Sequence, residues 1–125
     1  TFINSPSLLL NTLQFKSRGT LFFAGQLVGV EGYTESAAMG GFAGINAARA
    51  LAGQPLVTPP PTTAHGCLVG HVSASDPKHF QPMNTNYGLF PPLAQPVRDK
   101  EKKRQLIAQR AREDFERWMT QSALS

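Results

Sequence analysis

Hydrophobic and polar positions follow two distinct patterns in the first half of the chain. Residues 20–27 read TLFFAGQL, an apolar run on both faces that is typical of a strand buried within a parallel sheet. Small and apolar residues then continue over residues 34–51, which predicts a helix, and Gly53 follows as its end. Gly29 and Gly32 separate the two segments. The pattern therefore predicts a strand, a glycine turn and a helix.

Residues 98–120 carry the most regular pattern of the chain. Four apolar side chains recur at the spacing of one helical face: Ile107, Ala111, Phe115 and Trp118. Asp99 precedes them as the expected N-cap, because its carboxylate can accept hydrogen bonds from the first backbone N–H groups of a helix. The pattern predicts an amphipathic helix that docks by this stripe.

Prolines divide the segment between these two predicted units. The prolines at positions 59–61, 91, 92 and 96 exclude a helix interior and indicate extended connections. After the triproline, Thr62 is expected to cap a short helix that extends to His71, although the valine-rich end is also consistent with a strand. Residues 55–97 are therefore interpreted as a Pro-rich connector, with a short helix and a loop that packs back on a first domain of residues 1–54.

A strand buried within a parallel sheet needs a neighbouring strand on each side. Residues 1–4 are the one further candidate, and Pro6 interrupts that pattern soon afterwards. A length of 125 residues is enough for one domain. We therefore expect an incomplete sheet, in a chain that is the tail of a longer protein.

Composition changes this picture mainly through charge. The chain has 12 Lys and Arg residues against 8 Asp and Glu residues, a formal net charge of +4. Residues 98–117 hold most of these charges, and four basic side chains lie at the start of the predicted last helix: Lys100, Lys102, Lys103 and Arg104. They either contact RNA phosphates or form a solvated helix start, in which Asp99 and Glu101 dilute the positive charge.

Other functional classes receive little support from the sequence. No apolar run approaches the ~20 residues of a membrane-spanning helix, and a single cysteine excludes an internal disulfide, so a reducing cytoplasm and no membrane are expected. Cys67, His65, His71 and His79 lack the spacing of known metal motifs. A structural role for these four residues, with no metal, is the resulting interpretation.

The predicted glycine turn is the best candidate for a binding site. In open α/β sheets, ligands bind beyond the carboxyl ends of strands, where helix N-termini present unpaired N–H groups. Gly25, Gly29 and Gly32 would let the backbone approach a ligand closely. The N–H groups of residues 32–34 favour a phosphate or the electron-rich edge of a reduced flavin.

Three further glycines lie inside the predicted helix, at Gly40, Gly41 and Gly44. Each lowers helix propensity by ~1 kcal/mol relative to Ala, which indicates that large side chains are excluded from that face. Close approach to a sheet or to a bound cofactor explains this, and so does ordinary packing of helix on sheet with no ligand.

Several motifs together resemble one known family. They are the run FFAGQLVGVEGYTESAAMGGFAGINAARALAG, the segment VTPPPTTAHG, and FQPMNTNYGLFPPL with the basic helix after it. Over almost the whole chain they are similar to the C-terminal part of the folate-dependent, FAD-containing tRNA (uracil-5-)-methyltransferases, the TrmFO family. The glycine-rich run is shared with GidA-type tRNA modification flavoproteins, whereas PPPTT and FQPMN are particular to the methyltransferases.

The resemblance implies a fold and an activity. The fold is α/β, the C-terminal part of a Rossmann-like FAD-binding domain, followed by a mainly helical, Pro-rich extension. The full-length enzyme would use 5,10-methylenetetrahydrofolate and FADH2, with NAD(P) as a further cofactor, to form 5-methyluridine in the tRNA T-loop. This chain would complete the flavin site and be inactive alone, because the reactive cysteines and the GxGxxG strand of the family lie upstream, and Cys67 has no catalytic part.

The resemblance also assigns residues to FAD: Gly25, Gln26, Val30, Glu31, Gly32 and Tyr33. The first two would approach the ribityl and pyrophosphate groups, and the other four would lie by the isoalloxazine. Tyr33 and the loop of residues 80–91 are further candidates for the wall of the folate pocket. The expected partners are tRNA and the upstream portion of the enzyme. Two alternatives remain, the tail of a GidA-like flavoprotein and a stand-alone RNA-binding or assembly module.

Overall fold

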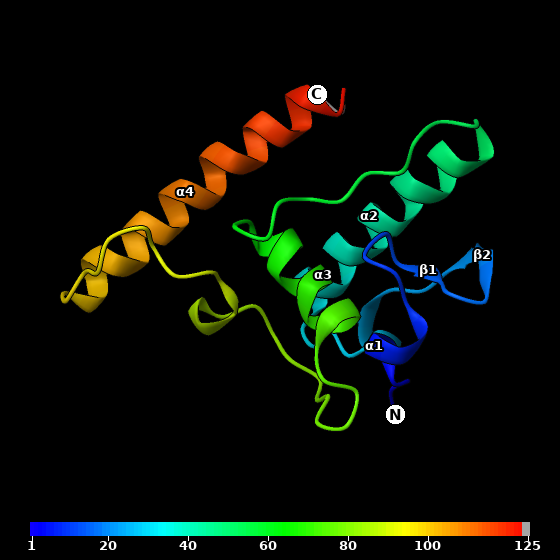
Figure 1. Ribbon diagram of the computed structural model, residues 1–125, viewed down its shortest axis with the longest axis horizontal. Helices are drawn as coiled ribbons and strands as arrows, with labels where there is room; N and C mark the ends of the chain where they lie inside the picture. Colours follow the sequence, from blue (N-terminus) through cyan, green and yellow to red (C-terminus); the bar gives the residue numbers. More distant parts are fainter. Residues whose placement is uncertain (124–125) are drawn as a thin grey trace.

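The computed structural model describes residues 1–123 as a mainly helical chain with one small antiparallel sheet (Figure 1). The elements in chain order are α1 (Ser5–Leu8), β1 (Gln14–Phe15), β2 (Arg18–Phe22), the 3-10 helix η1 (Gly25–Val28), α2 (Tyr33–Leu51), α3 (Ala64–Ala74), the 3-10 helix η2 (Tyr87–Leu89) and α4 (Lys100–Gln121). α2 and α3 form the centre, α1 packs on α3, and the β1–β2 hairpin lies beside α2. α4 lies to one side of this body, at the end of a long irregular segment.

The hydrophobic core lies where the N-terminal segment, α2 and α3 meet. Its buried members come from all three parts and from the loop that follows α3: Leu9, Leu13, Val28, Val30, Met39, Phe42, Ala43, Leu68, Val69, Val72 and Phe80. Residues 9–30 and 68–80 are far apart in sequence, so long-range contacts hold the glycine turn of residues 25–32 in place. The turn is therefore anchored on a packed core.

The predicted buried parallel strand over residues 20–27 is wrong. β2 ends at Phe22 and pairs with β1 in an antiparallel hairpin, and four of its five residues are exposed. The chain leaves the strand conformation because Gly25 adopts a φ of +78°, in the left-handed region, and opens η1. An apolar run alone does not distinguish a central strand from a strand that turns into a 3-10 helix. Residues 1–4 form no strand either, and Pro6 lies in the first turn of α1.

The predicted helix over residues 34–51 is confirmed as α2, which begins one residue earlier at Tyr33. Gly53 follows it with a φ of +71°, as expected for a residue just beyond a helix end. Gly40, Gly41 and Gly44 lie on its exposed face, and a Cβ atom at any of them would meet no described atom within 4 Å. The expected close approach at these three glycines is therefore absent from the part of the chain that the structure describes.

Asn46 is a buried polar residue of α2 that orders the connector. Its side chain donates to the carbonyl oxygens of Thr12 and Val57 and accepts a hydrogen bond from the Val57 N–H. These bonds satisfy the buried amide and attach the extended segment after α2 to the N-terminal region. The fixed segment then leads the triproline toward α3.

The helix after the triproline exists, but its cap and its end differ from the prediction. Thr63, not Thr62, is the N-cap of α3 and accepts a 2.9 Å hydrogen bond from the Gly66 N–H, and the helix continues to Ala74. The Thr62 hydroxyl instead donates to the Asp114 carboxylate of α4. Gly66 faces the triproline so closely that a Cβ atom would lie 2.9 Å from the Pro59 carbonyl oxygen and still closer to Pro60.

The predicted last helix is confirmed as α4, with Asp99 as its N-cap accepting from the Glu101 N–H at 3.0 Å. Ile107 is buried, whereas Ala111, Phe115 and Trp118 are half-buried. Phe115 stacks on His65 of α3 with a centroid distance of 4.9 Å, and Arg110 donates to the carbonyl oxygens of Pro91 and Pro92. Phe115 of the stripe therefore docks on α3, and Arg110 attaches α4 to the proline-rich loop.

Candidate functional site

The glycine turn between η1 and α2 has a backbone that only glycine adopts without strain. Gly25, Gly29 and Gly32 have φ angles of +78°, +96° and +90°. Gly29 ends η1, and Gly32 is the N-cap of α2 without any side-chain cap. The first N–H groups of a helix have no partner inside the helix, so the start of α2 faces this turn as a group of hydrogen-bond donors.

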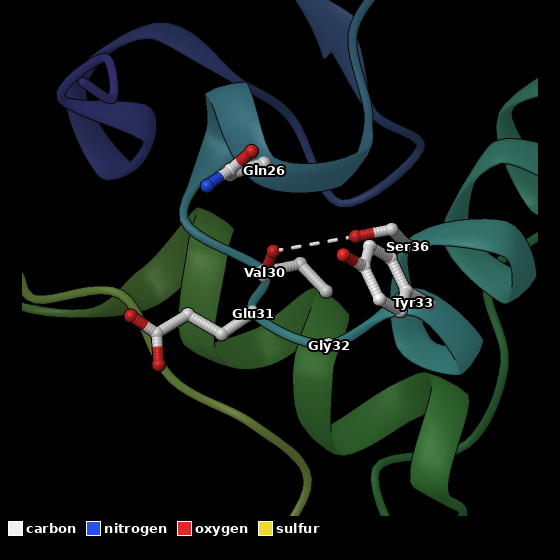
Figure 2. Close-up of a pocket in the computed structure, with 6 residues that line it drawn as sticks. All are labelled: Gln26, Val30, Glu31, Gly32, Tyr33 and Ser36. Atoms are coloured by element: carbon white, nitrogen blue, oxygen red, sulfur yellow. Dashed lines mark hydrogen bonds between the residues drawn. The ribbon is translucent and has the colours of Figure 1, made fainter.

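A cavity of about 330 Å³ opens at this turn (Figure 2). Its lining residues are Gln26, Val30, Glu31, Gly32, Tyr33 and Ser36. Figure 2 shows that Gln26 reaches the cavity from η1, whereas Tyr33 and Ser36 come from the first turn of α2. The Glu31 side chain extends away from Tyr33 on the other side of the turn.

Hydrogen bonds to the loop after α3 hold the turn in this shape. Val30 and Met83 form a parallel bridge, in which the Met83 N–H donates to the Gly29 carbonyl and the Glu31 N–H donates to the Met83 carbonyl. Ser36 donates to the Val30 carbonyl at 3.4 Å, the bond drawn in Figure 2. The backbone of the turn is therefore fixed from both sides by other segments of the chain.

The six residues assigned to FAD by resemblance do not all line the cavity. Five of them line it: Gln26, Val30, Glu31, Gly32 and Tyr33. Gly25 is not a lining residue and lies against Ser36, because a Cβ atom at position 25 would be 3.7 Å from the Ser36 Cβ. Tyr33 is 98% exposed, so the described residues leave its ring free. Val30 is fully buried, and its carbonyl oxygen accepts the hydrogen bond from Ser36.

Sequence reasoning missed two residues at this site. Ser36 lines the cavity, and Glu35 lies beneath Gly32, where a Cβ atom would come within 2.7 Å of its Oε1. The Glu35 carboxylate also accepts a 3.4 Å hydrogen bond from the Thr85 N–H, which links the first turn of α2 to the loop before η2. Glu35 and Ser36 lie three and four residues after Gly32, on the first turn of α2, and this spacing is the sequence signal that could have placed them beside the glycine turn.

The basic residues and the cysteine occupy other parts of the molecule. Lys100, Lys102, Lys103 and Arg104 are exposed on the first turns of α4, where the structure brings them together. Cys67 is buried in α3, and burial raises the pKa of its thiol to about 11, so it is protonated at neutral pH. Within residues 1–123, no group of three or more His, Cys, Asp or Glu side chains is placed to hold a metal ion.

The comparison with protein families concerns the N-terminal part of the chain. Residues 1–55 match the family model described as Glucose inhibited division protein A. This range includes η1, the glycine turn and all of α2, and therefore the whole lining of the cavity. None of the described helices is both long and apolar enough to cross a membrane.

Individual relatives narrow the resemblance to the methyltransferases. The chain is 55% identical over 119 residues to the "Methylenetetrahydrofolate--tRNA-(uracil-5-)-methyltransferase TrmFO" of Geotalea uraniireducens (strain Rf4), which covers 95% of this chain and 27% of that protein. The TrmFO protein of Pelotomaculum thermopropionicum (strain DSM 13744 / JCM 10971 / SI) is 54% identical over 94% of this chain and 27% of its own length. The TrmFO protein of Heliobacterium modesticaldum (strain ATCC 51547 / Ice1) is 51% identical over 99% of this chain and 28% of its own length. The resemblance seen in the sequence is confirmed, and the chain spans about a quarter of these curated relatives.

Proposed function

We propose that this chain acts as part of a TrmFO-type tRNA uracil-5-methyltransferase, which uses 5,10-methylenetetrahydrofolate and FADH2 to form 5-methyluridine in the tRNA T-loop. The observation that supports this most strongly is 55% identity to a TrmFO protein over 95% of the chain. The chain spans 27% of that relative. Within this proposal its partner is the remaining part of the same enzyme, without which it would be inactive. A cytoplasmic location suits an enzyme that acts on tRNA.

The GidA-like flavoproteins are the second candidate, because residues 1–55 match their family model. The similarity to TrmFO proteins continues well beyond this range, to a total of 119 aligned residues. The added part includes α3, the proline-rich loop and the start of α4. This extension favours the methyltransferase.

Within this proposal, the chain divides into three functional parts. Residues 1–54 are the C-terminal end of a Rossmann-like FAD-binding domain, residues 55–97 are the connector that packs back on it, and residues 98–120 form a basic helix. The contacts of Met83 with Gly29 and Glu31 support the packing of the connector on the first part. The Rossmann-like sheet itself would be contributed by other parts of the enzyme.

The glycine turn fits a flavin on structural grounds. Gly32 lines a cavity of about 330 Å³ at the start of α2, where the helix offers backbone donors, and the left-handed φ angles of Gly25, Gly29 and Gly32 give the turn its shape. The Gln26 amide would hydrogen-bond a ribityl hydroxyl, which both its donor and its acceptor atoms permit. FADH2, when bound, supplies the electrons that bring the transferred carbon to the methyl level.

Other residues of the turn would orient ligands. The N–H groups at Gly32 and Tyr33 would lie by the electron-rich edge of the isoalloxazine, and Tyr33 would wall the folate pocket, since 98% of its surface is available. Val30 and Glu31 would hold the backbone at the ring through their bonds to Ser36 and Met83. Lys100, Lys102, Lys103 and Arg104 would contact tRNA phosphates.

The test is a methylation assay on the complete protein that contains this chain. Purified protein should carry flavin, seen by visible absorbance, and should convert uridine to 5-methyluridine in an unmodified tRNA transcript when supplied with 5,10-methylenetetrahydrofolate and a reductant. Protein without flavin, or flavin-bearing protein that leaves the transcript unmethylated under these conditions, would contradict the proposal.

A further inference from the structure

A second cavity, of about 340 Å³, lies between the η2 segment and one face of α4. The aromatic residues Tyr87 and Phe90 line it from the η2 side, and Ala108 and Ala111 line it from α4. Thr85 and Asn86 add polar side chains. The two alanines are the small side chains that α4 presents to this cavity.

The η2 side of the cavity is preorganised by hydrogen bonds. The Asn86 side chain caps η2 by accepting from the Gly88 N–H at 2.9 Å, and it donates to the Asn84 carbonyl at 3.1 Å. The Thr85 N–H is held by the Glu35 carboxylate. Tyr87 is 46% exposed on this fixed segment, with its ring centroid 6.2 Å from that of Phe90.

Positive charge lies at the α4 side of the same cavity. Arg104 is one turn before Ala108 on the helix, and its guanidinium lies 5.6 Å from the centroid of the Tyr87 ring. Lys100 lies one turn earlier, and both basic side chains are exposed. Among residues 1–123, neither forms an ion pair with an acidic side chain, so their charge is available to a partner.

We infer that this cavity binds one unstacked base of an RNA strand, with Arg104 and Lys100 on the adjacent phosphates. Aromatic side chains beside a basic groove are the combination that binds single-stranded nucleic acid, because every base has a stacking face and every nucleotide carries a phosphate. Thr85 adds polar atoms for the base edges. The identity of the ligand as RNA rests on the proposed function.

An apolar peptide segment is a less suitable occupant of the same cavity. The cavity has no acidic lining residue among residues 1–123, and four basic side chains lie on the adjoining helix turns. Glu101 is the one acidic residue in the first turn of α4. The charge therefore complements a polyanion, whereas a peptide segment would not need it.

Two RNA probes separate base binding from phosphate binding. The complete protein is titrated into a fluorescein-labelled single-stranded oligouridylate and into an RNA duplex of equal strand length, and anisotropy gives both dissociation constants. A base in a duplex is paired and stacked, so only the single strand can fill the cavity. The account predicts tighter binding of the single strand, and equal binding of the two probes overturns it.

Cavity-filling variants make the same test at residue level. Ala108→Leu should weaken single-strand binding about tenfold, the scale of one base–aromatic stack, and change duplex binding less than about twofold. Tyr87→Leu, at a position that is 46% exposed, should give the same result, with folding checked by circular dichroism. Ala48→Leu makes the identical change on the exposed face of α2 and should alter neither constant. Wild-type single-strand affinity in Ala108→Leu and Tyr87→Leu overturns the inference.

Failure of this inference is distinguishable from failure of the proposed function. The joint variant Lys102→Ala/Lys103→Ala should weaken binding of both probes and reduce its salt dependence. For each phosphate that is no longer neutralised, the log–log slope should fall by about 0.7 for the single strand and about 0.9 for the duplex. An unchanged slope contradicts phosphate binding by these lysines and leaves the cavity test standing. Flavin absorbance of the same samples reports on the proposed function independently of RNA.

Discussion

The Phe80 ring lies directly against the backbone of Gly29, so that a Cβ atom at position 29 would come within 2.5 Å of its Cζ atom. Phe80 belongs to the loop after α3, and Gly29 ends η1, so this contact joins the loop to the glycine turn. The φ of +96° at Gly29 adds a second reason for glycine. One residue thus provides both the left-handed backbone and the room for a buried aromatic ring.

Gly29→Ala should therefore destabilise the protein by about 1–3 kcal/mol, through backbone strain and displacement of Phe80. Thermal unfolding of the complete protein measures this. Gly53→Ala is the matched control, because Gly53 has a φ of +71° but no atom within 4 Å of the added Cβ. The second change Phe80→Leu should partly restore the melting temperature of Gly29→Ala but not that of Gly53→Ala. Equal losses in the two alanine variants would refute the role of the Phe80 contact.

Gly66 and Gly70, on the same helix, should respond to alanine in opposite directions. Gly66→Ala should destabilise strongly, because its Cβ would overlap the carbonyl groups of Pro59 and Pro60, which are backbone and cannot rotate away. Gly70→Ala meets no described atom within 4 Å and should stabilise α3 by up to about 1 kcal/mol. Chemical denaturation of both variants checks this, and a tolerated Gly66→Ala would show that the triproline lies elsewhere.

His65 should make stability depend on pH below neutrality. Burial lowers its pKa from 6.5, so the unfolded chain binds a proton at a higher pH than the folded one. Stability therefore rises with pH and is lost as pH falls through the unfolded value of about 6.5. Melting temperatures at about pH 7.5 and about pH 5.5 should differ less in His65→Phe than in the wild type. His79→Phe, at an exposed histidine, is the control, and an identical pH response in His65→Phe would contradict the assignment.

Local patterns predict α2 and α4 because each is a long segment with its own periodicity and end signals. Asp99 caps α4 and Gly53 follows α2, both as the sequence indicates. The prediction for residues 20–27 is wrong because an apolar run carries no information on its partner strand, and Gly25 redirects the chain. Likewise, the exchange of roles between Thr62 and Thr63 depends on Asp114, which lies 52 residues after Thr62.

The candidate site is predictable where it depends on adjacent residues and not where it depends on distant ones. Five of the six residues assigned by resemblance line the cavity at the turn. The bonds of Met83 to Gly29 and of Thr85 to Glu35 join segments about 50 residues apart, and no local pattern specifies them. The proposed base-binding cavity depends in the same way on the meeting of Tyr87 with Ala108.

The flavin content of Gly32→Val in the complete protein tests the central claim most directly. Gly32 lines the cavity at the start of α2, and a branched side chain there would displace the Glu35 carboxylate, which lies within 2.7 Å of an added Cβ, and so disturb the turn that would hold the flavin. Gly53→Val is the control for backbone strain alone, since Gly53 also has a positive φ but no described atom within 4 Å of an added Cβ. With folding of both variants confirmed by circular dichroism, we expect Gly32→Val to purify without flavin absorbance and Gly53→Val to retain it. Folded Gly32→Val with the wild-type ratio of flavin to protein would contradict the placement of the flavin at this turn.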